Sequence, residues 1–207
     1  MLEITKTELL YTFDELSETA KENAISLYRS EQDLNYMLDE EYESIKNIAD
    51  AIGCTFELNS YYSYEINLDF YYGNKPDSEM ELAGRRAVAF IWNNYIDPNL
   101  KGKYYSTCGK YVNGKYTYKK RYSNCTKEFS CPFTGLYMDD DLYITFQKFC
   151  DEMKSNKNLT VSDFIEMLAD QLSSDWNAQV DWLLSEDHIK EEIEVNEMYF
   201  YSDGTAA

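Results

Sequence analysis

The sequence predicts an α+β fold, in which about five or six helices face a small, mostly antiparallel sheet. Three observations predict it. Apolar residues recur at helical spacing in several stretches, they alternate with polar residues over 64–70, and an Asn-Gly pair at 113–114 lies between alternating residues. With 207 residues, 44% of them hydrophobic, the chain is expected to form a single α+β domain, 1–207, with a basic, tyrosine-rich hairpin inserted at 101–137.

The first elements are expected to be a strand at 2–13 and a helix that Asp14 or Ser17 caps. A second helix is expected at about 34–52, with its buried stripe at helical spacing. Gly53 follows it and is the residue type that most readily adopts the left-handed conformation at a helix end.

A strand pair and a third helix follow. Residues 55–58 and 64–70 are expected to pair as a hairpin, and the alternation in the second strand gives it one acidic face. The third helix is expected to start near Asp77 or Ser78, either of which can cap it, and to stop before Pro98.

The C-terminal part is expected to hold three more helices and a final strand. The fourth helix covers about 141–154, and the fifth is capped by Thr160 or Ser162. Ser185 opens a short sixth helix, and 198–203 form the last strand.

Charge is distributed very unevenly along the chain. The net charge is −19, yet residues 101–127 contain no Asp or Glu and hold eight of the nineteen Lys and Arg residues. The remainder carries eleven basic and thirty-eight acidic residues, a net charge of −27. An acidic surface repels nucleic acid and favours basic partners. The plain alternative is that the charge serves only solubility.

Acidic residues gather in the second helix, the strand pair and the last two helices. Carboxylates spaced along helices can imitate duplex phosphates, which lie about 1.7 Å apart along the axis; charge runs are otherwise solvated faces. Glu41 lies with the acidic residues near the start of the second predicted helix. The candidate partner-binding residues are Asp39, Glu40, Glu43, Glu57, Glu65, Asp69, Asp163, Glu166, Asp170, Glu191 and Glu194.

The basic hairpin combines the residue types of a nucleic-acid contact, because Lys and Arg bind phosphates and Tyr rings stack on bases. The alternative is that it lies against the acidic faces of the same protein. The candidate residues for a contact with a partner or RNA are Lys110, Tyr111, Lys115, Tyr116, Tyr118, Lys119, Lys120, Arg121 and Tyr122.

Catalytic chemistry is not expected. His188 is the single histidine and falls in a charged stretch, where a solvated surface position is expected. No nucleophile–histidine pattern or phosphate-binding loop is present in the sequence. The run at 139–141 offers three Asp side chains that could hold Mg²⁺ or Ca²⁺, but it directly precedes a helix, which favours a capping role.

The five cysteines are expected to be reduced thiols, and no cofactor is expected. Cys108, Cys125 and Cys131 could bind zinc, but their spacing lacks the close pair typical of such sites. The N-terminus shows no basic region followed by an apolar one, and no apolar run approaches a membrane span, so a cytosolic protein without a membrane partner is expected.

The stretch YTFDELSETAKENAISLYR resembles the opening of small acidic accessory proteins of bacteriophages and prophages. The matching residues are Phe13, Glu15, Leu16, Ser17, Ala20, Lys21 and Ala24. The C-terminal WLLSEDHIKEEIEVNEMYFYSDG and the internal CPFTGLYMDDD are similar to pieces of the same set. These positions read as caps, core positions and turns, so no functional residue carries over from them.

The resemblance implies an accessory phage gene, and such genes often antagonise host defence, as anti-CRISPR and anti-restriction proteins do. It therefore implies a host CRISPR or other defence nuclease as partner, with or without its guide RNA, in the host bacterial cytoplasm. The basic segment departs from the set. The expected function is non-enzymatic inhibition of such a nuclease by acidic faces; the alternatives are a nucleic-acid-binding regulator that uses the basic hairpin, and a metal-dependent enzyme. No particular oligomeric state is predicted.

Overall fold

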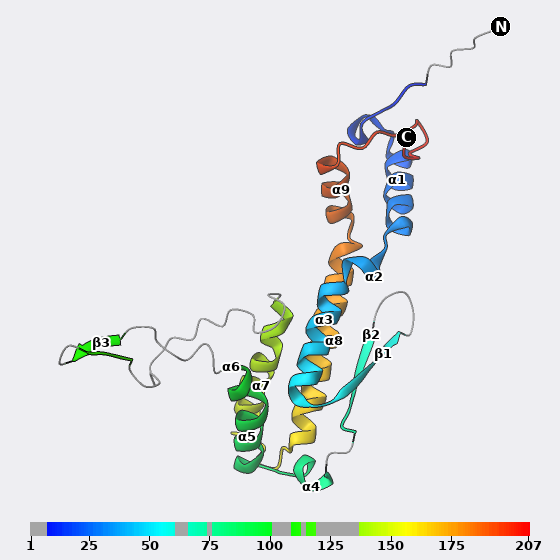
Figure 1. The fold of residues 1–207 in the computed structure, drawn as a ribbon. Helices are drawn as coiled ribbons and strands as arrows, with labels where there is room; N and C mark the ends of the chain where they lie inside the picture. The colour runs from blue at the N-terminus through cyan, green and yellow to red at the C-terminus, as the bar shows by residue number, and fades with distance from the viewer. Residues whose placement is uncertain (1–7, 61–65, 74–75, 101–108, 113–114, 119–136) are drawn as a thin grey trace. The chain divides into compact units, whose positions relative to one another are not determined.

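The computed structural model describes residues 8–60, 66–73, 76–100, 109–112, 115–118 and 137–207 (Figure 1). Helices and short antiparallel strand pairs make up this part of the chain, which confirms the α+β fold class. The contacts group into two compact units, Met1–Met37 with Ala178–Ala207 as unit 1 and Leu38–Asn177 as unit 2. The single domain stays a prediction.

Unit 1 contains α1 (Glu18–Glu31), α2 (Leu34–Met37) and α9 (Glu186–Val195). The Ser17 hydroxyl accepts the Ala20 backbone N–H at 3.3 Å, so it caps α1. The Ser185 hydroxyl accepts the backbone N–H of residue 188 at 3.2 Å and caps α9. Both caps satisfy backbone donors that a helix start leaves without partners, as predicted.

The two terminal strands are shorter than predicted. In the described part of 2–13, only Tyr11 forms a bridge, with two 2.9 Å backbone hydrogen bonds to Phe200. A 3-10 turn (η1, Phe13–Glu15) follows, because the Glu15 carboxylate accepts the Thr12 backbone N–H at 2.9 Å and turns the chain. The predicted strand 198–203 is likewise reduced to bridges at Phe200.

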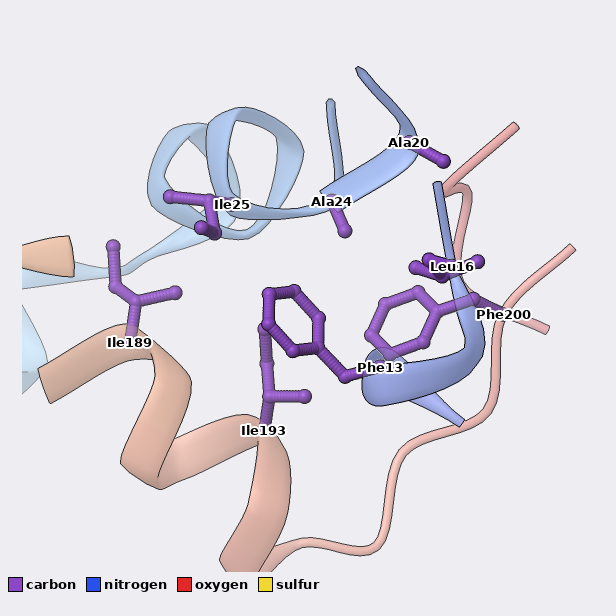
Figure 2. Packing of buried hydrophobic residues seen from close by; sticks show 8 residues of the cluster. All are labelled: Phe13, Leu16, Ala20, Ala24, Ile25, Ile189, Ile193 and Phe200. Carbon is purple, nitrogen blue, oxygen red and sulfur yellow. The ribbon is translucent and has the colours of Figure 1, made fainter. Parts of the chain in front are cut away.

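A hydrophobic cluster holds unit 1 together (Figure 2). The Phe13 and Phe200 rings meet edge to face, with centroids 6.2 Å apart. The cluster joins both chain ends to α1 and α9, so these four segments depend on one another for burial. Its buried members are Phe13, Leu16, Ala20, Ala24, Ile25, Ile189, Ile193 and Phe200.

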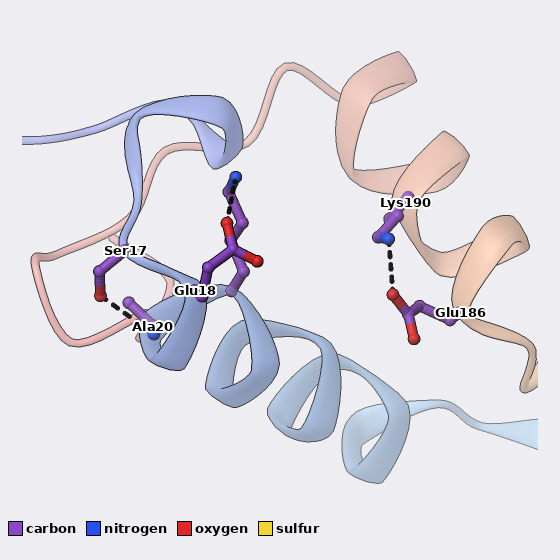
Figure 3. A network of polar contacts seen from close by, with 6 residues as sticks. Ser17, Glu18, Ala20, Glu186 and Lys190 are labelled. Atoms are coloured by element: carbon purple, nitrogen blue, oxygen red, sulfur yellow. Dashed lines mark hydrogen bonds and ion pairs between the residues drawn. The ribbon is translucent and has the colours of Figure 1, made fainter.

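Ion pairs on the surface of unit 1 join residues of the same helix (Figure 3). Lys21 Nζ lies 3.2 Å from Glu18 Oε1 on α1, and Lys190 Nζ lies 2.5 Å from Glu186 Oε1 on α9. Exposed pairs of this kind contribute little to stability. They neutralise charge locally on α1 and α9.

Unit 2 begins with α3 (Asp39–Ile52), followed by β1 (Thr55–Ser60) and β2 (Ile66–Tyr71). The predicted helix 34–52 is divided in two, because Leu38 has a non-helical backbone (φ −107°, ψ 14°). Gly53 ends α3 at φ 66°, as predicted. The predicted hairpin is confirmed, and β1 and β2 pair antiparallel from Thr55↔Tyr71 to Ser60↔Ile66.

The predicted third helix is interrupted near its start. It forms α4 (Asp77–Met80) and then α5 (Arg85–Ile91). Pro76 stands at the N-cap position of α4, which has no side-chain capping bond, so the predicted cap at Asp77 or Ser78 is wrong. Between them, Leu82 O accepts the Val161 N–H at 3.1 Å, and the Gly84 N–H donates to Leu159 O at 3.0 Å. These backbone hydrogen bonds to a distant segment replace the helical ones.

The same helix also continues past its predicted end. After α5 come a π-helical stretch (η2, Trp92–Ile96) and α6 (Asp97–Leu100), so the predicted stop before Pro98 is wrong. The Asp97 N–H bonds to Trp92 O, five residues earlier. A proline lacks an N–H and crowds the carbonyl four residues before it, and the wider π turn accommodates both effects.

The Asn-Gly hairpin prediction is confirmed. Strands β3 (Gly109–Val112) and β4 (Lys115–Tyr118) pair antiparallel, and the Val112↔Lys115 pair leaves two residues for the connection. The rest of 101–136 lies outside the described residues.

The remaining predicted helices are confirmed as α7 (Asp141–Glu152) and α8 (Val161–Leu183), preceded by the 3-10 turn η4 (Tyr137–Asp140). The Thr160 hydroxyl accepts the Asp163 N–H at 3.2 Å and caps α8. Phe149 of α7 packs edge to face on Phe164 of α8, with ring centroids 5.7 Å apart. No helix in the described residues has the length and apolar character needed to cross a membrane.

Candidate acidic binding surfaces

The β1–β2 hairpin places two carboxylates directly opposite each other. Glu57 pairs with Asp69 in the strand register, and both side chains are exposed. Asn59 Nδ2 donates to Asp69 Oδ2 at 2.8 Å, and the Tyr71 hydroxyl donates to Glu57 Oε2 at 3.2 Å. The charge of Glu57 is the main reason why the pKa of Tyr71 is raised. Like charges in this position destabilise a strand pair, so the fold holds them there at a cost.

The opposite side of the hairpin is fixed to α8, which explains why the acidic side faces outward. Leu68 is buried, and its N–H donates to the Ser173 hydroxyl at 2.9 Å. The Asn177 amide contacts both backbone groups of Ile66, accepting its N–H at 2.8 Å and donating to its carbonyl at 3.1 Å. These side chains satisfy the outer edge of β2 and prevent another strand from pairing there.

Helix α8 carries a second acidic stretch. Asp163, Glu166 and Asp170 lie three and four residues apart, which places them on one side of the helix. Glu166 and Asp170 are exposed. Asp163 is half-buried, because its carboxylate accepts the N–H and the hydroxyl of Thr160 at 2.7 and 2.8 Å. It is therefore partly committed to capping.

The hairpin and the start of α8 meet at Tyr72. Its hydroxyl lies 3.1 Å from the Ser162 hydroxyl, which joins the end of β2 to the first turn of α8. Burial raises the pKa of Tyr72, and the charges of Glu166 and Asp163 raise it further. This contact places the first turn of α8, with Asp163 and Glu166, beside the end of β2.

The third acidic stretch, at the start of α3, differs in part from the sequence prediction. Asp39 and Glu40 are exposed in the first turn, where the helix dipole favours negative charge. Glu43 is half-buried and paired with Lys46 at 3.0 Å. Glu41 is only 6% exposed, and burial raises its pKa, so its assignment to an acidic surface is wrong.

The last two candidates, Glu191 and Glu194, are exposed on α9 and belong to unit 1. The acidic candidates are thus divided between the units. Glu65 lies outside the described residues, as do Lys119, Lys120, Arg121 and Tyr122. Of the basic segment, the structure gives only the backbone pairing of β3 and β4, which carry Lys110, Tyr111, Lys115, Tyr116 and Tyr118.

The expectation for His188 is wrong. It is 9% exposed, and its ring contacts that of Trp182 at a tilt of 34°, with centroids 4.0 Å apart. Ser185 caps α9, and His188 in the first turn of that helix contacts Trp182 in the last turn of α8.

The run at 139–141 also behaves differently from a cap. Asp140 stands at the N-cap position of α7 without a side-chain capping bond, and Asp141 is 1% exposed. Across the described part of the chain, no group of three or more His, Cys, Asp or Glu side chains is placed to hold a metal ion. Of the cysteines, Cys54 is buried and Cys150 is half-buried, and neither forms a disulfide with a described residue; Cys108, Cys125 and Cys131 lie outside the described residues.

A pair of carboxyl groups, the buried Asp141 and the half-buried Asp175, joins α7 to α8, and the sequence did not indicate it. Burial, together with a hydrogen bond to Asp175 and the charge of that residue, raises the pKa of Asp141 to about 8. Gln171 Nε2 donates to Asp175 Oδ2 at 2.7 Å, and Lys148 Nζ donates to Gln171 Oε1. Because Asp141 is inaccessible, it belongs to the core and not to a binding surface. The sequence feature that could have indicated this pair is the presence of two polar residues, Asp141 and Thr145, four positions apart on the apolar side of α7.

Comparison with protein-family models, with curated proteins and with solved structures finds no match for this chain. The function therefore has to be inferred from the residues.

Proposed function

We propose that the protein is a phage-encoded, non-enzymatic inhibitor of a host defence nuclease, of the anti-CRISPR type, acting in the host bacterial cytoplasm. The acidic surfaces occupy a basic channel that the nuclease uses for DNA. The observation that carries the proposal is the exposed Glu57–Asp69 pair, two like charges fixed opposite each other by hydrogen bonds from Asn59 and Tyr71.

Fixed carboxylates suit this role for two reasons. Their positions are set before binding, so little side-chain entropy is lost when a partner's cations reach them. The repulsion between them also falls when a Lys or Arg side chain lies between them. Glu166 and Asp170, exposed on α8, add further negative charge at helical spacing, as in an imitation of nucleic-acid phosphates.

The experiment is gel filtration of the purified protein with a panel of defence nucleases, each with and without its guide RNA. We expect co-elution with one nuclease and loss of its DNA binding. Glu57→Gln with Asp69→Asn should weaken co-elution, because the pair loses its charge and keeps its hydrogen-bond acceptors. The matched control is Glu81→Gln with Glu152→Gln, two exposed residues outside the acidic stretches. Failure of every nuclease to co-elute contradicts the proposal.

A second candidate is a regulator that binds RNA or DNA through the basic segment. The observation that favours it is the β3–β4 hairpin, which lies within a stretch that lacks acidic residues. Changing Lys119, Lys120 and Arg121 to Glu should then abolish binding to free nucleic acid and flatten its salt dependence. Binding that survives this change rejects the second candidate.

A further inference from the structure

A cavity of about 340 Å³ opens in unit 1, between the turn at Phe13 and the end of α9. Its apolar lining consists of Phe13, Ile193 and Met198. Phe13 and Ile193 are buried members of the hydrophobic cluster (Figure 2), and Met198 packs against that cluster. The apolar wall is therefore built into the core of the unit and does not depend on surface side chains.

The charged lining comes from two directions. Asp14 lies in the N-terminal turn, whereas Glu194 and Glu197 lie at the end of α9, and all three are exposed. Among the described residues that line the cavity, none is basic. The cavity thus combines an apolar wall with three carboxylates that lack a cation in the lining.

The backbone fixes the position of Glu197. Its N–H donates to Glu194 O at 3.1 Å, and the Met198 N–H donates to Ile193 O at 3.2 Å, the hydrogen-bond pattern of a Schellman helix end. Glu197 stands at φ 49°, where glycine or asparagine is usual, and no other described non-glycine residue has a positive φ. The turn therefore keeps a carboxylate at the cavity in a backbone conformation that disfavours it.

The opposite wall is fixed as well. The Glu15 carboxylate accepts the Thr12 N–H at 2.9 Å and sets the turn that carries Asp14. Just before it, Tyr11 is bonded to Phe200 through both backbone groups. Both charged sides of the cavity are thus held by backbone hydrogen bonds.

We propose that this cavity binds an arginine side chain of a basic protein partner; the inference rests on the proposed function, in which the partner presents a basic surface. The methylene stem of arginine packs on the apolar wall while its head pairs with carboxylates. A planar guanidinium donates in several directions at once, which suits carboxylates from two sides better than the compact ammonium of lysine does. The exposed ring of Tyr199, also in the lining, offers a stacking face.

The test is a titration of the full chain, methyl-labelled at Ile and Met, with N-acetyl-arginine N-methylamide followed by NMR. We expect saturable shifts of the Ile193 and Met198 methyl signals, with a dissociation constant in the millimolar range. The citrulline analogue has nearly the same shape and no charge, and it should bind at least about five-fold more weakly because the charge-assisted pairing is lost. Absence of shifts at these two methyl groups, or equal binding of the citrulline analogue, overturns the inference.

Variants locate the effect. Glu194→Gln with Glu197→Gln should weaken arginine binding at least about five-fold, whereas Glu22→Gln with Glu31→Gln, exposed on α1, should leave it unchanged. If both pairs behave alike, the carboxylates of the cavity are not the ligands and the inference fails. The two proposals fail separately. If arginine does not bind, nuclease inhibition is still tested by the Glu57 and Asp69 variants. If arginine binds here but no nuclease does, the arginine site stands and the proposed function is rejected.

Discussion

Glu57 and Asp69 stand opposite each other across the β1–β2 hairpin, and each carboxylate accepts a hydrogen bond from a side chain of the other strand. The Tyr71 hydroxyl donates to Glu57, and the Asn59 amide donates to Asp69. A hairpin gains nothing in stability from two facing negative charges. The buried contacts of Leu68 with α8 hold the pair in place against this repulsion. The arrangement is understandable as part of a binding surface for cations.

Removing the charge of this pair should change stability and binding in opposite directions. We expect Glu57→Gln with Asp69→Asn to raise the free energy of unfolding by about 0.5 kcal/mol, because the cross-strand repulsion disappears. The same variant should bind the nuclease more weakly. Urea unfolding and gel filtration measure the two effects, and a variant that is less stable but binds normally would show that the pair serves the fold.

The Asp141–Asp175 pair predicts a dependence of stability on pH. Burial raises the pKa of Asp141 from its ordinary value of 3.8 to about 8. Between these values the folded protein retains a proton that the unfolded chain releases, so stability should fall as the pH rises from 4 to 8. Each unit by which folding shifts a pKa corresponds to a change of about 1.4 kcal/mol in the free energy of unfolding.

Asp141→Asn should remove this dependence, because an amide stays neutral and still donates to Asp175. The stability of the variant relative to the natural protein should rise as the pH rises from 4 to 8, because the natural protein alone then loses the stabilisation that the proton on Asp141 provides. Asp50→Asn, at an exposed position, is the control. Urea midpoints at several pH values decide the matter; curves for Asp141→Asn and the natural protein that run parallel would show that Asp141 ionises normally.

The left-handed backbone of Glu197 predicts a stabilising substitution. Glu197→Gly should raise the free energy of unfolding by about 1 kcal/mol, because glycine adopts φ 49° without a steric cost. Glu197→Gln keeps the Cβ atom and should leave stability unchanged. Thermal unfolding of the two variants checks this, and a destabilised glycine variant would mean that the side chain contributes more to the fold than its backbone costs.

Alanine substitutions at two glycines with positive φ distinguish the cost of backbone strain from the cost of a steric clash. A Cβ atom on Gly204 (φ 90°) would lie 2.1 Å from Ala20 O, whereas one on Gly73 (φ 58°) would meet nothing within 4 Å. Gly73→Ala should therefore cost only the backbone term, about 1 kcal/mol. Gly204→Ala should cost at least about 3 kcal/mol, because the C-terminal turn must move away from α1. Equal losses in the two variants would contradict the close approach at Gly204.

Local patterns in the sequence predicted the caps of α1, α8 and α9, the end of α3 and both hairpins. Ser17, Thr160 and Ser185 cap their helices, and Gly53 ends α3, because these signals act within one turn of the chain. The alternation in 64–70 predicted the acidic face of β2, since strand periodicity depends only on neighbouring residues. The exposed positions of Glu166, Asp170, Glu191 and Glu194 agree with the acidic surfaces expected from the sequence.

Features that depend on distant segments were not predictable in this way. The break before α5 arises from backbone bonds between 82–84 and 159–161, and His188 is buried by Trp182. The helix passes Pro98 because a π turn precedes it, which no single-residue rule anticipates. Glu41 and Asp141 belong to acidic runs, yet packing places them in the interior. The cavity lined by Phe13 and Ile193 joins segments about 180 residues apart in the chain.

Competition between the protein and labelled target DNA for a guide-loaded defence nuclease, followed by fluorescence anisotropy, tests the central claim most directly. If the acidic surfaces occupy the DNA channel, the protein should displace DNA from the nuclease with which it co-elutes, and Glu57→Gln with Asp69→Asn should require at least about five-fold more protein than the Glu81→Gln with Glu152→Gln control. A nuclease that carries the protein and target DNA at the same time, with no change in DNA affinity, would contradict the account.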